Sequence, residues 1–222
     1  MPSPSSPHQA ALAQYRRRAS VYDAELALFE PVRRQAIAQL ALQAGDTVID
    51  AGCGTGLSLR ALREAVGPSG QVTGIEQCPE MLAQARDCVA REGWRNVTLI
   101  EASVEDAPLA LAADAALFHF THDILRAPAA VSNVMQALRP GADVVACGLK
   151  WAAPWAWPVN LFVFGAALHS VTSLDGLAEP WGLLRAPVGG LVVESTMAGA
   201  VFIAHGRRRR REQSNNTEET TR

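Results

Sequence analysis

An apolar strand that runs into a glycine-rich turn and then a helix is compatible with few folds. One stretch of the chain has this form, and it reads Thr47-Val48-Ile49-Asp50-Ala51-Gly52-Cys53-Gly54-Thr55-Gly56. Asp50 closes the apolar run, and a helical pattern begins at Leu57. Glycine serves where the backbone needs positive φ or must approach a ligand closely. The stretch therefore predicts a strand, turn and helix that present backbone amides and a helix N-terminus to a ligand.

A second apolar strand follows about twenty residues later and ends in an acid. It covers residues 71–75 and is closed by Glu76. In a doubly wound sheet the ends of these two strands lie side by side, and an acid there can accept hydrogen bonds from ribose hydroxyls. The glycine spacing is Gly-x-Gly-x-Gly, which differs from the Gly-x-Gly-x-x-Gly of dinucleotide-binding proteins. The spacing therefore argues against a dinucleotide ligand.

The segment from Asp50 to Gly56 resembles the first motif of class I S-adenosylmethionine (SAM) dependent methyltransferases, and Val72–Glu76 resembles the second-strand motif of that family. The likeness continues over roughly residues 20 to 206. It implies an α/β fold, with a Rossmann-like, doubly wound, mostly parallel sheet of seven strands in the order 3-2-1-4-5-7-6. Helices are expected on both faces of the sheet, and the last strand is expected to be antiparallel. The implied cofactor is SAM, with S-adenosylhomocysteine as its product.

The resemblance also implies roles for residues around the strand ends. Asp50 would hold the amino group of SAM, Glu76 would bind its ribose hydroxyls, and the glycine loop would seat its methionine part. Where family members often have an acid-Ala pair for adenine, this chain has Ser103-Val104, and Glu105 is an outside candidate for the same contact. The full set of expected cofactor residues is Asp50, Gly52, Cys53, Gly54, Gly56, Glu76, Gln77, Ser103, Val104 and Phe118.

The candidates for proton transfer follow the fourth predicted strand, in a segment that resembles the fourth motif of the family. We rank His122 first, then Asp123 and His119. Histidine can take a proton near neutral pH. Each residue also has a structural interpretation. His119 shares a strand face with core-facing Leu117, His122 can be a packed loop residue, and Asp123 can cap the turn before the next helix.

Residues 150–188 are rich in aromatic side chains and interrupt the alternation of strands and helices. In the family this region builds the acceptor pocket, so we expect Trp151, Trp155 and Trp157 to contact the acceptor, with Tyr15 and Tyr22 in a lid above the cofactor. Packing alone also explains such aromatic residues. The stretch from residue 151 to 174 has no charged residue, but its prolines and its place inside one sheet argue against a membrane-spanning helix. A peripheral membrane contact remains open.

The expected organisation is a disordered leader (1–8), one methyltransferase domain (9–206) and a disordered Arg-rich tail (207–222). Within the domain we expect lid helices over 9–44 and a substrate-side insertion over 150–188. Gly45 is expected to end the helix that opens at Glu30, and residues 139–142 are expected to form a turn. The predicted strands are Thr47–Ala51, Val72–Glu76, Asn96–Glu101, Asp114–Phe120, Val144–Leu149, Leu191–Thr196 and Val201–His205.

Composition limits the choice of partners and compartment. The net charge is −2, and the tail from residue 207 holds six Arg and three Glu, so the rest of the chain is acidic and we expect no nucleic acid partner. The four cysteines are scattered, which favours reduced thiols in a cytoplasmic protein over disulfides or a metal site. The N-terminus lacks the pattern of a signal peptide. We expect a monomer or a homodimer.

Three functions compete at this point. The first is a SAM-dependent methyltransferase that acts on an oxygen or nitrogen of a small molecule, which the aromatic block predicts to be apolar, aromatic or lipid-like. The second is a SAM-binding regulatory or partner protein without catalysis, which the changed adenine motif at Ser103 permits. The third is a dinucleotide-dependent oxidoreductase, against which the glycine spacing and a closing hairpin argue.

Overall fold

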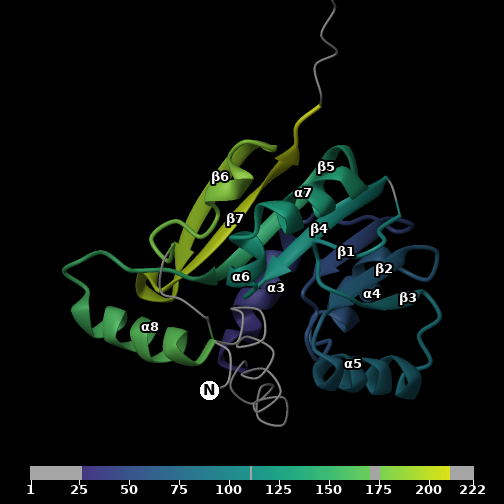
Figure 1. Cartoon of the computed structure of the whole chain (residues 1–222), viewed down its shortest axis with the longest axis horizontal. Helices are drawn as coiled ribbons and strands as arrows, with labels where there is room; N and C mark the ends of the chain where they lie inside the picture. Colours follow the sequence, from purple (N-terminus) through teal and green to yellow (C-terminus); the bar gives the residue numbers. More distant parts are fainter. Residues whose placement is uncertain (1–26, 111, 171–175, 211–222) are drawn as a thin grey trace, which may run out of the picture.

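A computed structural model of the chain describes residues 27–110, 112–170 and 176–210. Its centre is one seven-stranded sheet in the order β3-β2-β1-β4-β5-β7-β6 (Figure 1). The strands are β1 Thr47–Ala51, β2 Gln71–Glu76, β3 Val97–Glu101, β4 Ala113–His119, β5 Leu138–Leu149, β6 Val188–Thr196 and β7 Val201–Arg208. Strands β1 to β5 pair in parallel, and β7 runs antiparallel to both β5 and β6. The predicted strand order and the antiparallel last strand are confirmed.

Helices cover both faces of this sheet, as expected. One core layer joins α3, α4 and α5 to side chains such as Val48 and Leu117, and the other joins α7 to Ile49 and Phe118. Successive side chains of a strand point to opposite faces, so neighbouring residues of β1 enter different layers. The helices are α3 Glu30–Ala38, α4 Leu59–Val66, α5 Pro79–Arg91, α6 His122–Leu125, α7 Pro128–Ala137 and α8 Trp157–Ser170, with 3-10 turns η1 Ala27–Phe29, η2 Gly182–Leu184 and η3 Met197–Gly199.

Three predicted boundaries were wrong. Helix α3 ends at Ala38 rather than near Gly45, because Ala41 adopts a φ of 47° that a right-handed helix cannot contain. The turn expected at 139–142 lies inside β5, where the pairing with β4 jumps from Ala113↔Leu138 to Ala115↔Asp143 and so accommodates the extra residues. Strand β7 runs to Arg208 and so includes the first two residues of the predicted tail, of which Arg207 pairs with Asp143.

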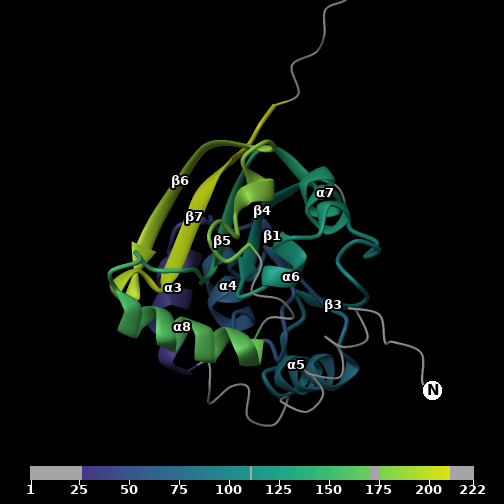
Figure 2. The same ribbon diagram turned by 60° about the vertical axis from the view of Figure 1, so that its left-hand side comes forward.

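Helix α8 stands apart from the sheet, beyond the carboxyl ends of the parallel strands (Figures 1 and 2). It is attached through Val163, which is fully buried, and through Asn160, whose side chain accepts from the Ala152 N–H at 2.8 Å. Leu161, Phe162 and other apolar side chains on its outer surface are exposed. No helix among the described residues is both long and apolar enough to cross a membrane.

The turn between α4 and β2 sets β2 beside β1, and it falls where the sequence predicts it. The Asn96 side chain donates hydrogen bonds to the carbonyl groups of Gly67 and Gly70, at 3.0 and 2.9 Å. A Cβ atom added at Gly70 would lie 2.5 Å from Val66 Cβ and 2.6 Å from the Asp46 carbonyl oxygen. The turn therefore has no room for a side chain at this position.

We predict that Gly70→Ala lowers the free energy of unfolding by about 2 kcal/mol, because backbone atoms must move to relieve the overlap. The matched control is Gly182→Ala, where an added Cβ meets no atom within 4 Å. Urea unfolding of both variants measures the difference. An equal, small effect for the two variants would contradict the tight packing of this turn.

Candidate functional site

The glycine-rich loop after β1 adopts a backbone that side chains would disrupt. Gly52, Gly54 and Gly56 all have positive φ, at 83°, 56° and 91°. A Cβ at Gly52 would lie 2.6 Å from the side chain of Thr121, so the loop and the end of β4 are in close contact. The N–H groups of Gly52 and Cys53 donate to the Ile75 carbonyl at 3.0 and 2.9 Å. These bonds tie the loop to β2 and fix its position at the sheet edge.

Glu76, at the end of β2, is turned toward this loop. One carboxylate oxygen accepts from the Gly54 N–H at 3.1 Å, and the other accepts from the Cys78 N–H at 2.7 Å. Burial raises the pKa of Glu76, and the backbone hydrogen bonds oppose that rise. Glu76 thus connects the glycine loop to the start of α5. Its predicted role toward ribose hydroxyls stays a prediction.

Asp50, the acid that opens the first motif, is buried and its carboxylate has no hydrogen-bond partner. Its side chain is 1% exposed, and neither carboxylate oxygen accepts a hydrogen bond within the protein. Burial raises the pKa of Asp50 to about 7. The charge of Arg33 opposes this rise, and the charge of Glu76 adds to it. A buried carboxylate without hydrogen bonds is costly. Asp50 therefore has the chemistry to hold a cationic or N–H-bearing group of a ligand.

Arg33 of α3 is the cation that faces this region, and it is also buried, at 3% exposure. Its Nη1 pairs with Glu30 one turn earlier in the helix, whereas Nε and Nη2 have no partner. The charge of Arg33 acts on Asp50, His119 and Cys147. Helix α3 therefore brings an enclosed positive charge over the ends of β1, β4 and β5.

Unsatisfied polar atoms are concentrated at this place. Within the described part of the chain, buried side-chain nitrogen or oxygen atoms without a partner occur in seven residues, of which five lie here. They are Arg33, Asp50, His119, Thr121 and His122. Buried polar groups in folded proteins are otherwise almost always paired, with protein, water or a ligand. The concentration of such groups beside a positive-φ glycine loop marks this edge as a polar ligand site.

The two candidate histidines lie inside the protein. Burial and the nearby charge of Arg33 lower the pKa of His119 to about 3, so its ring is neutral and suited to packing. His122 Nε2 donates to the Leu149 carbonyl at 2.8 Å, which leaves Nδ1 with a lone pair but no partner. A Cβ atom added at Gly148 would lie 2.7 Å from the His122 ring, so the ring occupies space that only a glycine at this position leaves open. Burial also lowers the pKa of His122.

The backbone between these histidines is strained. Phe120 has a φ of 56°, which is rare for a bulky residue. Its ring packs against Phe29 at the start of α3, with centroids 4.6 Å apart, and against His119 at 4.9 Å. Phe29 and Phe120 thus form an apolar cover next to the polar cluster.

On the far side of the glycine loop, Gln77 and Ser103 line one open hollow of about 540 Å³, together with Glu105 and other residues of the β3 end. The Ser103 hydroxyl donates to Asp106 at 2.7 Å, so its oxygen keeps lone pairs that can accept from a ligand. The structure brings these predicted residues together. Phe118, by contrast, is fully buried in the core between β4 and α7, and its side chain offers no surface to a cofactor.

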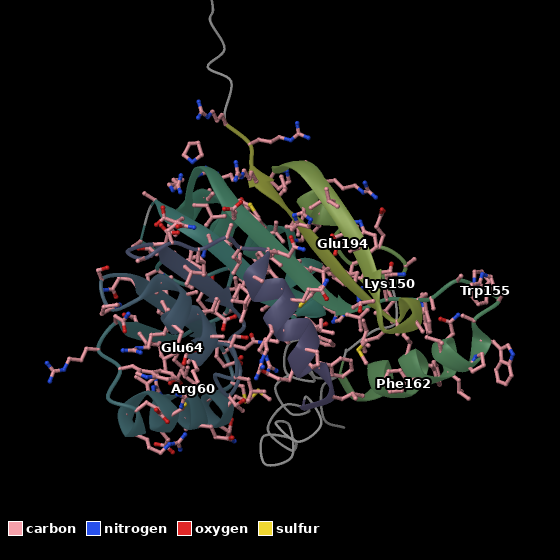
Figure 3. All side chains as sticks on the ribbon, turned by 180° about the vertical axis from the view of Figure 1, so that it is seen from behind. Arg60, Glu64, Lys150, Trp155, Phe162 and Glu194 are labelled. Carbon is pink, nitrogen blue, oxygen red and sulfur yellow. The ribbon has the colours of Figure 1, made fainter. Side chains whose placement is uncertain are left out.

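The residues predicted to contact the acceptor lie in different environments. Trp151 is partly buried against the core, whereas Trp155 and Trp157 are 84% and 69% exposed. Figure 3 shows Trp155 at the outer edge near α8, away from the sheet. Asp123 lies in α6, one residue after His122. Tyr15 and Tyr22 lie outside the described residues.

Sequence reasoning missed Arg33 and Thr121. A signal for Arg33 was present, because Arg33, Ala36, Ile37 and Leu40 follow the i, i+3, i+4, i+7 spacing of a buried helix face. Thr121 had no such signal, since its position depends on the approach of the glycine loop to β4. Among the described residues no group of His, Cys, Asp or Glu could hold a metal ion, and all four cysteines are free.

Comparisons with known proteins agree with this geometry. The family model of the methyltransferase domain matches residues 48–141. The chain is 28% identical to malonyl-[acyl-carrier protein] O-methyltransferase of Serratia marcescens over 137 residues, which are 62% of this chain and 51% of that protein. It is 37% identical to demethylmenaquinone methyltransferase of Shouchella clausii over 76 residues, which are 34% of this chain and 32% of that protein. The chain thus spans about half or less of these relatives.

A solved structure shares the fold over most of the chain. The SAM-dependent O-methyltransferase of Thermotoga maritima superposes with a TM-score of 0.62 at 16% identity, over 83% of this chain and 67% of that one. This likeness covers more of the chain than the residues 48–141 that the family model matches.

We predict that Asp50→Asn stabilises the ligand-free protein more at high than at low pH. The folded-state pKa of about 7 lies above the ordinary 3.8, so the folded protein keeps a proton that the unfolded chain loses. Stability of the wild type therefore falls as pH rises from about 4 to about 7, by on the order of 3 kcal/mol, and asparagine removes this loss. Urea unfolding at about pH 5 and about pH 8 measures the difference.

The matched control for this test is Asp87→Asn, an exposed acid on α5. It should leave the dependence of stability on pH close to that of the wild type. If Asp50→Asn gave the same change at both pH values, the carboxylate would not be held in the buried state described above.

Proposed function

Because the chain belongs to the class I SAM-dependent methyltransferases, we propose that it transfers a methyl group from SAM to a small-molecule acceptor. The observation that carries this proposal is the buried, unpartnered carboxylate of Asp50 beside a loop of three positive-φ glycines. Each feature matches a part of the cofactor. Asp50 suits the ammonium group of the methionine part, and bare backbone suits close approach of the rest.

When bound, SAM supplies a methyl group on a positively charged sulfonium, so the leaving group is already activated. The protein then has to orient the acceptor and keep water out. Phe29 and Phe120 supply an apolar cover next to the polar cluster. Glu76 holds the glycine loop through Gly54, and we assign it the ribose hydroxyls as its ligand partner. Gln77 and Ser103, which line the same hollow, are assigned to the adenine side.

The acceptor we propose is apolar, aromatic or lipid-like, with an oxygen or nitrogen as the methylated atom. Support comes from the uncharged stretch 151–174 and from the exposed aromatic side chains of α8 and the loop before it. One relative points the same way, since its name gives demethylmenaquinone as the acceptor, whereas another is named for a malonyl group on a carrier protein. Trp155 and Trp157 are the residues that we assign to acceptor contact, with Trp151 behind them.

A proton acceptor is needed only if the acceptor molecule arrives protonated. His122 remains the first candidate, because its Nδ1 carries a lone pair and no partner, and Asp123 on the same helix is the second. His119 is the weakest of the three, since burial and Arg33 oppose its protonation. The burial of both histidines is also the observation that favours the alternative, a SAM-binding protein without catalysis.

We predict that the protein releases S-adenosylhomocysteine in the presence of SAM and at least one member of a panel of quinols, phenols and acyl thioesters. Mass spectrometry of the product and calorimetry with S-adenosylhomocysteine test this together. Tight cofactor binding without turnover on the whole panel would support the non-catalytic alternative. If neither SAM nor S-adenosylhomocysteine bound to the protein, the assignment of the site would be overturned.

We further predict that Trp157→Ala raises the KM for the acceptor by about tenfold and leaves kcat and SAM affinity close to wild type, because a large exposed ring contributes mainly to binding. Leu183→Ala, an exposed apolar residue on η2, is the matched control. Steady-state kinetics with the acceptor found above measures both. An unchanged KM for Trp157→Ala would remove α8 from the acceptor site.

A further inference from the structure

A second groove lies on the α7 side of the sheet, away from the proposed cofactor site. Its volume is about 410 Å³, and its walls come from α7, from the segment around η2 and from the end of β7. Because β7 runs antiparallel to β5, Val201 lies beside Leu149 at the cofactor edge, and Arg208 lies about 24 Å away at about 3.4 Å per residue. Figure 1 shows β7 ending on the side of the molecule opposite α8. A small ligand in this groove, called here the α7 groove, therefore cannot reach the glycine loop.

The α7 wall of the groove is mainly apolar. Val131 and Met135 line it and are only 4% and 6% exposed, so they form its floor. Ser132 and Gln136 line it too, but the Gln136 side chain donates to the Ser132 hydroxyl at 2.9 Å. The lining covers residues 128–136, which is about 12 Å along the helix at 1.5 Å per residue. The wall thus offers an apolar strip that matches one extended hydrocarbon chain.

The facing wall adds one apolar side chain and a positive rim. Leu183 of η2 and Pro187 lie on this wall, and Arg208, Arg209 and Arg210 complete it. The Arg209 N–H donates to the Pro187 carbonyl at 2.9 Å, which ties the end of β7 to the chain just before β6. The position of this arginine rim is therefore fixed by the sheet itself.

The rim arginines differ from other arginines nearby in having no acidic partner. Arg207 pairs with Asp143, and Arg139 pairs with Asp114. Within the part of the chain that the structure describes, the arginines at 208–210 form no ion pair, and no acid lines the groove. Guanidinium groups match the geometry of carboxylate and phosphate groups. The rim is thus complementary to an anion, in a chain whose net charge is −2.

We propose that the α7 groove binds an anionic single-chain amphiphile of the kind that a free fatty acid represents. The carboxylate contacts the arginine rim, and the hydrocarbon chain follows α7 over Met135 and Val131. The fold supports this direction, because α7 leads directly into β5 at the edge of the sheet where β7 ends. The charged rim therefore lies at one end of the apolar strip, as the charge does in a fatty acid.

The shape of the groove favours a free amphiphile over a bilayer. Its volume lies within the range of small-molecule sites, which is roughly 300–1,000 Å³. Among the lining residues that the structure describes, Leu183 is the one large apolar side chain that is exposed, at 39%. A surface that enters a bilayer presents its large apolar side chains outward. The groove instead keeps its apolar floor inside the protein, where a single chain can reach it.

The test compares three ligands by isothermal titration calorimetry on the full chain. Octanoate, below its micellar concentration, carries both the charge and the chain; octanol lacks the charge, and acetate lacks the chain. We expect octanoate to bind about tenfold more tightly than octanol, because the carboxylate gains charge-assisted hydrogen bonds. Acetate should give no measurable binding. Equal affinities for octanoate and octanol would remove the arginine rim from the site.

Two pairs of matched variants locate the site. Arg208→Gln should weaken octanoate binding about tenfold and leave octanol unchanged, whereas Arg207→Gln, the same charge change on the other face of β7, should alter both by less than about twofold. Leu183→Asn should weaken both ligands about fivefold, because it removes apolar contact. Leu161→Asn, at an exposed leucine of α8, is its control and should change neither affinity.

Equal losses for Arg208→Gln and Arg207→Gln would show a diffuse effect of charge and overturn the proposal. Other occupants would overturn it as well: tighter binding of phosphatidylglycerol vesicles would indicate a membrane, and tighter binding of polyglutamate an acidic protein. A dimer that octanoate dissociates in sedimentation velocity would assign the groove to a second copy of the chain. SAM affinity, measured on the same samples, should be unchanged in all four variants, so the result is independent of the proposed function.

Discussion

The structure depends on a carboxylate and a guanidinium that are enclosed in one region and do not meet. Asp50 lies in the central strand β1, one residue before its end, and Arg33 lies on α3, which packs in the same core layer as Val48 of β1. Each group is buried with idle hydrogen-bonding atoms, which an isolated protein would not retain without cost. The pKa of Asp50 is raised for the same reason, because burial disfavours its charged form. Both groups therefore keep hydrogen-bonding capacity that a polar ligand can use.

The fold places these groups through short, specific contacts. The three positive-φ glycines let the loop turn back against β2, and the bonds from Gly52 and Cys53 to Ile75 hold it there. Glu76 then fixes the loop from the neighbouring strand. At the other side, Phe120 adopts a strained backbone that directs its ring toward Phe29 of α3. Strain at the edge where ligands bind in open α/β sheets is consistent with a functional site.

The sequence predicted the parts of the site that local pattern determines. The strand that carries Asp50, the glycine loop and the acid at Glu76 all lie where spacing and the family resemblance place them. The extension of β5 through Pro140 and Gly141 was missed, because a Pro-Gly pair indicates a turn and only the shifted pairing with β4 shows otherwise. Arg33 was missed because a charged residue is expected at the surface, and only its helical spacing to Ile37 indicates burial.

The crystal structure of the protein with S-adenosylhomocysteine is the most direct test of this account. The account predicts that the α-ammonium of the ligand lies roughly 3 Å from the carboxylate of Asp50. It also predicts the ribose near Glu76, at the end of β2. A structure in which the amino-acid end of the ligand is turned away from Asp50 and the glycine loop would contradict it.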